Sequence, residues 1–194
     1  MPLQNRVTPL GELLAVGDRG LVYGNRGCLH DEPGRIRRQW QVKRWIACRL
    51  EFRGRRRSSP MPPGRYTGLF FLDEATAFAA GHRPCAECRR EDYNRFLAIV
   101  GERRADAVDE RLHAERLGAR ASRPLASLPD GAFVLRDGEP WLVLGRELLR
   151  WTPGGYAERV PRPDGDAVVV TPPMLLDVLQ AGWSGVVPLL ALTG

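Results

Sequence analysis

A chain of 194 residues with 43% hydrophobic and 27% charged residues falls in the ordinary globular range, which excludes extensive disorder. No apolar stretch approaches the roughly 20 residues that cross a bilayer, and the first residues lack the apolar segment of a signal peptide. We therefore expect a cytoplasmic protein without a membrane partner. In that compartment its four cysteines are more naturally metal ligands or buried thiols than disulfides.

The formal charge of +6 is unevenly distributed along the chain. Residues 1–104 carry 20 basic and 11 acidic side chains, whereas residues 105–194 carry 9 and 12. Residues 35–57 contain ten basic side chains and a single acid, Glu51. This concentration indicates a polyanionic partner, DNA or RNA. The alternative is compositional bias, because 28 of the 29 basic residues are arginine, and the basic face would then be solvated without a ligand.

Two strands and a short helix are predicted in the middle of the first half. Alternating apolar and polar residues predict a half-buried strand over residues 42–52, and residues 66–72 form the next predicted strand. Asp73 is the expected N-cap of a helix over residues 74–80, because its side-chain oxygen can accept from the free amides of the first turn. Gly81 stands where a left-handed residue would end that helix.

Two helices and a change of composition follow. Apolar residues at helical spacing predict an amphipathic helix over residues 89–103, and residues 106–117 continue helically with a more polar surface. The loop-like composition from residue 118 onwards coincides with the reversal of charge. We therefore place a domain boundary there, between an N-terminal region of residues 1–117 and a C-terminal region of residues 118–194.

The C-terminal region is predicted to be rich in strands. Residues 132–135 and 141–144 flank a turn-rich connection that is typical of a β-hairpin, and residues 147–151 and 167–170 are further candidate strands. Thr171 and Pro172 are the expected cap and first residue of a last helix. The predicted fold class is α+β: a small zinc-stabilised α/β module with a following helix and a β-rich C-terminal region.

The pair Cys85-Ala-Glu-Cys88 is the strongest chemical signal in the sequence. Two cysteines at this spacing can direct both thiolates at one tetrahedral Zn²⁺, which then needs two further N or S ligands. The competing interpretations are a redox dithiol and two incidental cysteines. Cys28 and His30, in a glycine-rich turn, are the predicted second pair. Cys48 is the rival ligand, because the apolar face of its strand suits an inert buried thiol but the rim of the sheet also suits a metal ligand.

The segment Phe70–Arg90 resembles the second half of the metal-binding domain of Ada-type DNA repair proteins. It contains a strand, a short helix, Gly-His-Arg-Pro-Cys-Ala-Glu-Cys and a following arginine in the order typical of that family. The resemblance implies a small zinc-stabilised α/β fold, binding to the DNA backbone and, in the best-known members, transfer of a methyl group from a phosphotriester to a zinc-bound cysteine. Here the first cysteine pair of the family is replaced by Cys28-Leu-His30, which favours a structural zinc.

These observations predict a zinc-containing nucleic-acid-binding protein with a role in DNA repair or the damage response. Six arginines are the candidate phosphate contacts: Arg53, Arg55, Arg56, Arg57, Arg89 and Arg90. A methyl-accepting or DNA-processing enzyme, in which Cys28 or Cys48 takes the alkyl group, and a zinc-stabilised protein-interaction scaffold are the two alternatives. Whether the chain is an enzyme stays open at this point.

Overall fold

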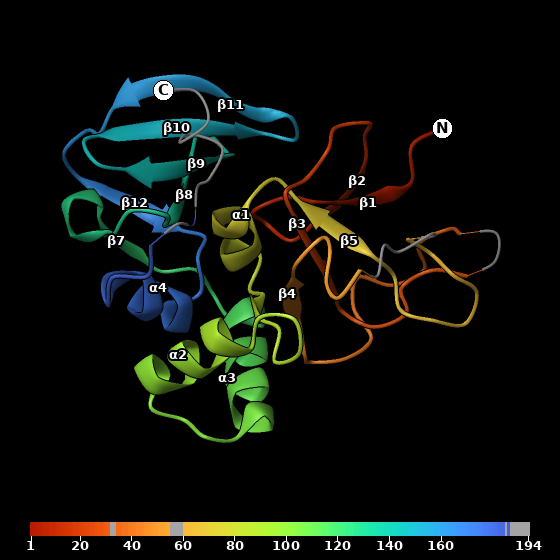
Figure 1. Cartoon of the computed structure of the whole chain (residues 1–194). Coiled ribbons are helices and arrows are strands. Elements are labelled where there is room, and N and C mark those ends of the chain that lie inside the picture. Colours follow the sequence, from red (N-terminus) through yellow and green to blue (C-terminus); the bar gives the residue numbers. More distant parts are fainter. Residues whose placement is uncertain (32–33, 55–59, 185, 187–194) are drawn as a thin grey trace.

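The computed structural model describes residues 1–31, 34–54, 60–184 and 186, and it contains two six-stranded sheets and four α-helices (Figure 1). The α+β fold class predicted from the sequence is confirmed. Within the described residues, no helix is both long enough and apolar enough to cross a membrane.

The N-terminal sheet is built from short strands and has the order β2-β1-β5-β3-β4-β6. Its strands are β1 (Gln4–Val7), β2 (Leu13–Ala15), β3 (Val22–Asn25), β4 (Ile46–Cys48), β5 (Leu69–Phe71) and β6 (Arg83–Pro84). Strands β1 and β5 are parallel, as are β4 and β6, while the remaining neighbours are antiparallel. The two strands predicted over 42–52 and 66–72 are therefore real but reduced to three residues each.

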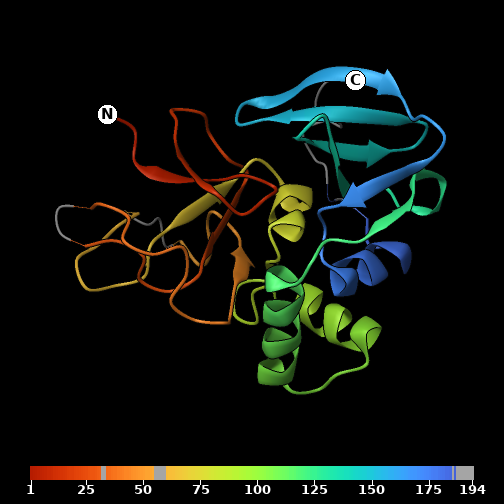
Figure 2. The same ribbon diagram turned by 180° about the vertical axis from the view of Figure 1, so that it is seen from behind.

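Helix α1 (Glu74–Ala79) begins as predicted at Asp73, whose Oδ1 accepts a hydrogen bond of 2.8 Å from the amide of Thr76. Gly81 follows with φ +81°, and a Cβ there would collide with the side chain of Arg116, so glycine is required. The helix lies between the two sheets (Figures 1 and 2). All six of its residues are buried, which makes α1 the central element of the molecule.

Helices α2 (Arg90–Val100) and α3 (Ala105–Leu117) follow the cysteine pair and lie together at one end of the molecule (Figure 2). They correspond to the helices predicted over 89–103 and 106–117. Gly101 ends α2 in the left-handed conformation, with φ +69°.

The C-terminal sheet is antiparallel throughout and has the order β11-β10-β9-β8-β12-β7. Its strands are β7 (Ser122–Pro124), β8 (Phe133–Arg136), β9 (Glu139–Leu144), β10 (Glu147–Thr152), β11 (Gly155–Pro161) and β12 (Asp166–Val169). The predicted hairpin is present as β8 and β9, whereas β7 and β11 were not predicted.

Helix α4 (Pro173–Gln180) starts one residue later than expected. Pro172 is its N-cap, so the prediction that Thr171 caps the helix was wrong. The hydroxyl of Thr171 accepts a hydrogen bond from the Phe133 amide instead, at 2.9 Å. This side chain therefore joins the end of β12 to β8.

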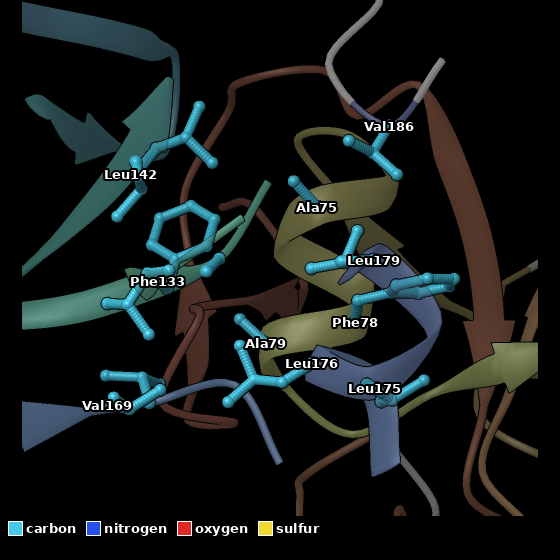
Figure 3. Close-up of a cluster of buried hydrophobic side chains, with 14 of the residues drawn as sticks. Ala75, Phe78, Ala79, Phe133, Leu142, Val169, Leu175, Leu176, Leu179 and Val186 are labelled. Atoms are coloured by element: carbon cyan, nitrogen blue, oxygen red, sulfur yellow. The ribbon is translucent and has the colours of Figure 1, made fainter. Parts of the chain in front are cut away.

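The largest core joins the C-terminal sheet to α1 and α4 (Figure 3). Phe78 and Ala79 of α1 are buried in the same cluster as Phe133 of β8, Leu142 of β9 and Leu176 of α4. On the other side, Ala77 and Ala80 belong to the core of the N-terminal sheet. The largest core thus contains residues from both sides of position 118, and the domain boundary proposed there stays a prediction.

Candidate metal centre and basic pocket

Three cysteines meet where the N-terminal sheet reaches α2. One ligand atom each of Cys48, Cys85 and Cys88 lies within 4.8 Å of the others, and all three residues are buried. A tetrahedral zinc with Zn–S distances of about 2.3 Å places its sulfurs roughly 3.8 Å apart. The spacing of the three sulfurs is therefore compatible with coordination of one zinc ion. Cys48, Cys85 and Cys88 can therefore hold a metal ion.

The backbone explains how Cys48 reaches the pair. Strands β4 and β6 are parallel, with Ile46 opposite Arg83 and Ala47 opposite Pro84, so the next residues in register are Cys48 and Cys85. The amide of Cys85 donates to the carbonyl of Ala47 at 2.9 Å and fixes this register. The third sulfur thus comes from a strand distant in sequence.

Backbone amides point at two of the sulfurs. The amide of Glu87 lies 3.4 Å from Sγ of Cys85, and the amide of Arg49 lies 3.4 Å from Sγ of Cys88. Hydrogen bonds of this kind stabilise thiolates and orient them, as the groups around metal ligands commonly do. The site is thus built for negatively charged sulfur.

The thiols also share hydrogen bonds with one another. Hydrogen bonds donated by Cys48 and Cys88 lower the pKa of Cys85 far below the usual range of a thiol. The hydrogen bonds to Cys85 and Cys88 raise the pKa of Cys48, and burial adds to this effect. The hydrogen bond from Cys48 lowers the pKa of Cys88. The hydrogen bond from Cys88 to Cys85 and the burial of Cys88 outweigh this effect, so the pKa of Cys88 is raised. The group therefore concentrates thiolate character on Cys85, and a metal ligand must be deprotonated.

Of the four ligands predicted from the sequence, the structure brings together Cys85 and Cys88. Cys28 and His30 lie outside the three-sulfur group. The Cys28 thiol is 3.6 Å from the His30 carbonyl, and Nδ1 of His30 is 2.6 Å from the hydroxyl of Thr67. A role for either in completing the ligand set stays a prediction.

A pocket of about 780 Å³ contains all three cysteines in its wall. Three arginines line the same pocket, Arg44, Arg49 and Arg65, and each is exposed. Among the described lining residues, Glu87 is the acidic side chain. We call this cavity the cysteine pocket, and among its described lining residues the arginines outnumber the carboxylates.

The arginines proposed from the sequence are differently placed. Arg53 is exposed, with its guanidinium 5.0 Å from the ring centre of Phe52, and Arg90 is exposed at the start of α2. Arg89 is engaged within the protein, because it forms ion pairs with Glu74 and Asp92.

The remaining three predicted contacts, Arg55, Arg56 and Arg57, lie outside the described residues. They follow Gly54, which lines the cysteine pocket. Arg44, Arg49 and Arg65 were missed as site residues, although the first two belong to the basic stretch 35–57 that the charge distribution singled out.

The chain matches no model of a known protein family, no curated protein and no solved structure. The geometry of the cysteines and arginines therefore carries the functional assignment.

Proposed function

We propose that this chain is a zinc-containing nucleic-acid-binding protein in which Cys48, Cys85 and Cys88 hold the ion. The observation that carries the proposal is that three convergent cysteines and three exposed arginines line one pocket. The thiolates supply a metal site, and the arginines beside it supply a surface for phosphates.

Zinc is the metal that the donor set favours. Thiolate ligands select zinc over the hard cations magnesium and calcium, which prefer oxygen, and zinc accepts tetrahedral thiolate-rich sites. Three protein sulfurs leave one position for a further ligand. Cys28 and His30 are the side chains that we propose for it from the sequence. Bound zinc would stabilise the junction of β4, β6 and the cysteine turn, and we propose a structural role for it.

Phosphate groups are the proposed partners of the exposed arginines. An arginine fork matches phosphate oxygens and contributes affinity without base specificity. Arg44, Arg49 and Arg65 are the contacts that the structure adds to those proposed from the sequence, of which Arg53 and Arg90 are exposed among the described residues. Binding of DNA or RNA at this face should therefore be sensitive to salt and tolerant of sequence.

The likeness of Phe70–Arg90 to the Ada metal-binding domain supports DNA as the nucleic acid. On this basis we extend the proposal to a role in DNA repair or the damage response. A scaffold that binds only protein would instead leave the arginines without phosphates to contact.

The test is binding of a labelled DNA duplex, a DNA single strand and an RNA, measured by fluorescence anisotropy over a range of salt concentrations. Replacing Arg44, Arg49 and Arg65 together with Ala should weaken binding for all sequences alike. It should also reduce the slope of log K against log salt by about 2–3 for duplex DNA, because each lost phosphate contact is worth about 0.9.

The matched control removes the same charge from the other sheet. Arg123, Arg136 and Arg159 are exposed on β7, β8 and β11, and their joint replacement by Ala leaves the cysteine pocket intact. This control should bind as the wild type does. Equal losses of affinity in both triple variants would mean that net charge alone causes the weaker binding. If the wild-type chain binds none of the three nucleic acids, the proposed function is refuted.

A second candidate function is methyl acceptance, which is favoured by the position of the cysteines in the pocket wall. In that reaction a thiolate sulfur attacks the methyl carbon of a phosphotriester, the new S–C bond replaces the O–C bond, and a phosphodiester anion leaves. Incubation with methylphosphotriester DNA, followed by intact mass and peptide mapping, decides between the two. We expect no added methyl group. If one methyl group per chain is found on Cys28, Cys48, Cys85 or Cys88, the zinc site would serve methyl acceptance and would not be purely structural.

A further inference from the structure

A second pocket, of about 400 Å³, lies where α1, α3 and the N-terminal loops meet. None of its described lining residues also lines the cysteine pocket. Its wall includes Gly11, Arg26, Trp40, Trp45, Arg116 and Arg120, and we call it the tryptophan pocket.

Arg26 is the unusual residue of this pocket, because its side chain is 0% exposed and its hydrogen-bond partners are neutral. Its Nε donates to Nε2 of His82 at 3.2 Å, and its Nη1 donates to the carbonyls of Gly11 at 2.9 Å and Gln39 at 3.3 Å. Among the described residues, Nη2 has no hydrogen-bond partner. A Cβ on Gly11 would lie 3.8 Å from this nitrogen, which places Nη2 beside a residue of the pocket wall.

Arg116 brings a second guanidinium to the same place. The guanidinium carbons of Arg26 and Arg116 lie 4.0 Å and 4.2 Å from the ring centre of Trp45. Arg116 donates to the carbonyls of Gly81 and Lys43, both at 2.7 Å, while its Nε has no partner within the described part of the chain. Two like charges therefore converge on one aromatic ring.

The acids near the pocket do not neutralise these charges by direct contact. Within the described residues, neither Arg26 nor Arg116 forms a salt bridge with a carboxylate. Glu115 lines the pocket, but its carboxylate accepts from Arg111 at 3.0 Å and from the Met174 amide at 2.9 Å. Glu12 also lines the pocket and is exposed.

We propose that the tryptophan pocket binds a small organic oxyanion, a phosphate monoester or a carboxylate, whose charge is matched by Arg26 and Arg116. A buried guanidinium without a counter-charge is costly, and a planar oxyanion or phosphate is the partner that its fork fits best. Exposed Arg120 adds charge at the rim. The volume exceeds what an inorganic ion needs and lies in the range of small-molecule sites, so an apolar or aromatic group on the ligand packs against Trp40. This site is independent of the proposed zinc and nucleic-acid function.

Three probes test the proposal on the full chain: inorganic phosphate, phenyl phosphate and benzoate. Tryptophan fluorescence and thermal unfolding report binding. We expect saturable binding of phenyl phosphate or benzoate, tighter than that of inorganic phosphate. Preference for phenyl phosphate assigns a phosphate ligand, and preference for benzoate assigns a carboxylate. No saturation by any probe up to roughly 10 mM, where binding free energy falls below about 3 kcal/mol, overturns the proposal.

Variants locate the binding. Arg26→Lys keeps the charge but loses the fork and should weaken binding at least tenfold, and Arg120→Ala should weaken it several-fold. Trp40→Ala should remove the advantage of phenyl phosphate over inorganic phosphate. The last two residues are exposed, so these variants decide the question even if Arg26→Lys does not fold.

The control variant replaces Arg44 and Arg49 of the cysteine pocket with Ala and should bind the probes as the wild type does. Loss of binding in this control, with unchanged binding in Arg120→Ala and Trp40→Ala, would place the anion in the cysteine pocket and overturn the proposal.

Discussion

Arg83 and Asp109 form a buried two-point ion pair, in which Nε donates to Oδ1 and Nη2 donates to Oδ2, both at 2.7 Å. The side chains are 2% and 6% exposed. Arg83 lies in β6, two residues before Cys85, and Asp109 lies in α3. The pair therefore fastens α3 to the strand that positions the cysteine turn.

Breaking this pair should be more harmful than removing it. Arg83→Met leaves a buried carboxylate without a partner and should cost roughly 3–5 kcal/mol of unfolding free energy. Urea unfolding measures the loss. The double variant Arg83→Met with Asp109→Leu should recover much of it, since neither charge of this pair is then left without its partner. A double variant as unstable as the sum of both single variants would contradict this account.

The stability should depend on pH through His82. Burial lowers the pKa of His82 well below 6.5, and the charges of Arg26 and Arg116 lower it further. Below pH 6.5, the ordinary pKa of about 6.5 lets the histidine of the unfolded chain bind a proton, while His82 of the folded chain stays neutral. The contribution of His82 to folding stability is therefore fully present above about pH 6.5 and is lost as the pH falls. His82 contributes up to about 1.4 kcal/mol per pH unit to that loss.

His82→Gln tests this dependence, since glutamine can still accept from Arg26 but does not titrate in this range. Unfolding free energies of both proteins at pH 5, 6, 7 and 8 give the comparison, because every other titrating group is common to the two. The variant should show the shallower decline below pH 6.5. Identical slopes would mean that folding does not lower the pKa of His82.

The core around α1 should unfold as one unit. Phe78 is fully buried in the cluster that joins α1, α4 and the C-terminal sheet. Phe78→Ala should therefore cost roughly 3–5 kcal/mol, and thermal unfolding should stay a single transition for residues on both sides of position 118. Leu117→Ala, at a side chain that is 65% exposed, is the control and should change stability by less than about 0.5 kcal/mol. Two separate transitions would show that the regions 1–117 and 118–194 fold independently.

The arginines that follow Gly54 should contribute to nucleic-acid binding. Replacing Arg55, Arg56 and Arg57 with Ala should weaken binding about equally across sequences and lower the salt slope by about 2–3 units for duplex DNA. Anisotropy titrations in several salt concentrations measure both effects. Unchanged affinity and salt slope would show that these three arginines do not contact nucleic acid, as expected if they reflect compositional bias alone.

Local patterns predicted the local parts of this fold. Asp73, with its cap on Thr76, and Gly81, with its positive φ, were readable because their roles depend on neighbours within one turn. The hairpin of β8 and β9 was readable for the same reason. The strands of the N-terminal sheet are only two to four residues long. Strands β4 and β5 were predicted because each lies within a longer strand-like run, residues 42–52 and 66–72, whereas β1, β2, β3 and β6 were missed.

In the two pockets, too, the features set by neighbouring residues could be predicted from the sequence, and those set by tertiary packing could not. Cys85 and Cys88 share one turn, so their spacing alone indicates that the two sulfurs converge. The place of Cys48 depends on the parallel pairing of β4 with β6, which no local pattern reveals. Arg26 is hidden for a related reason: in sequence it is one arginine in a glycine-rich loop, and only tertiary packing buries it against Trp45.

Metal content measured by mass spectrometry on protein purified without chelator tests the central claim most directly. The wild-type chain should contain about one zinc ion, and Cys48→Ser, Cys85→Ser and Cys88→Ser should each lose it and melt at lower temperature, because the free energy of zinc binding contributes to folding. Cys28→Ser tests the fourth position separately: a weaker but measurable zinc affinity would assign Cys28 as the fourth ligand, and an unchanged affinity would exclude it. A wild-type chain without metal, or a Cys48→Ser variant that keeps its zinc at full affinity, would contradict the three-cysteine site.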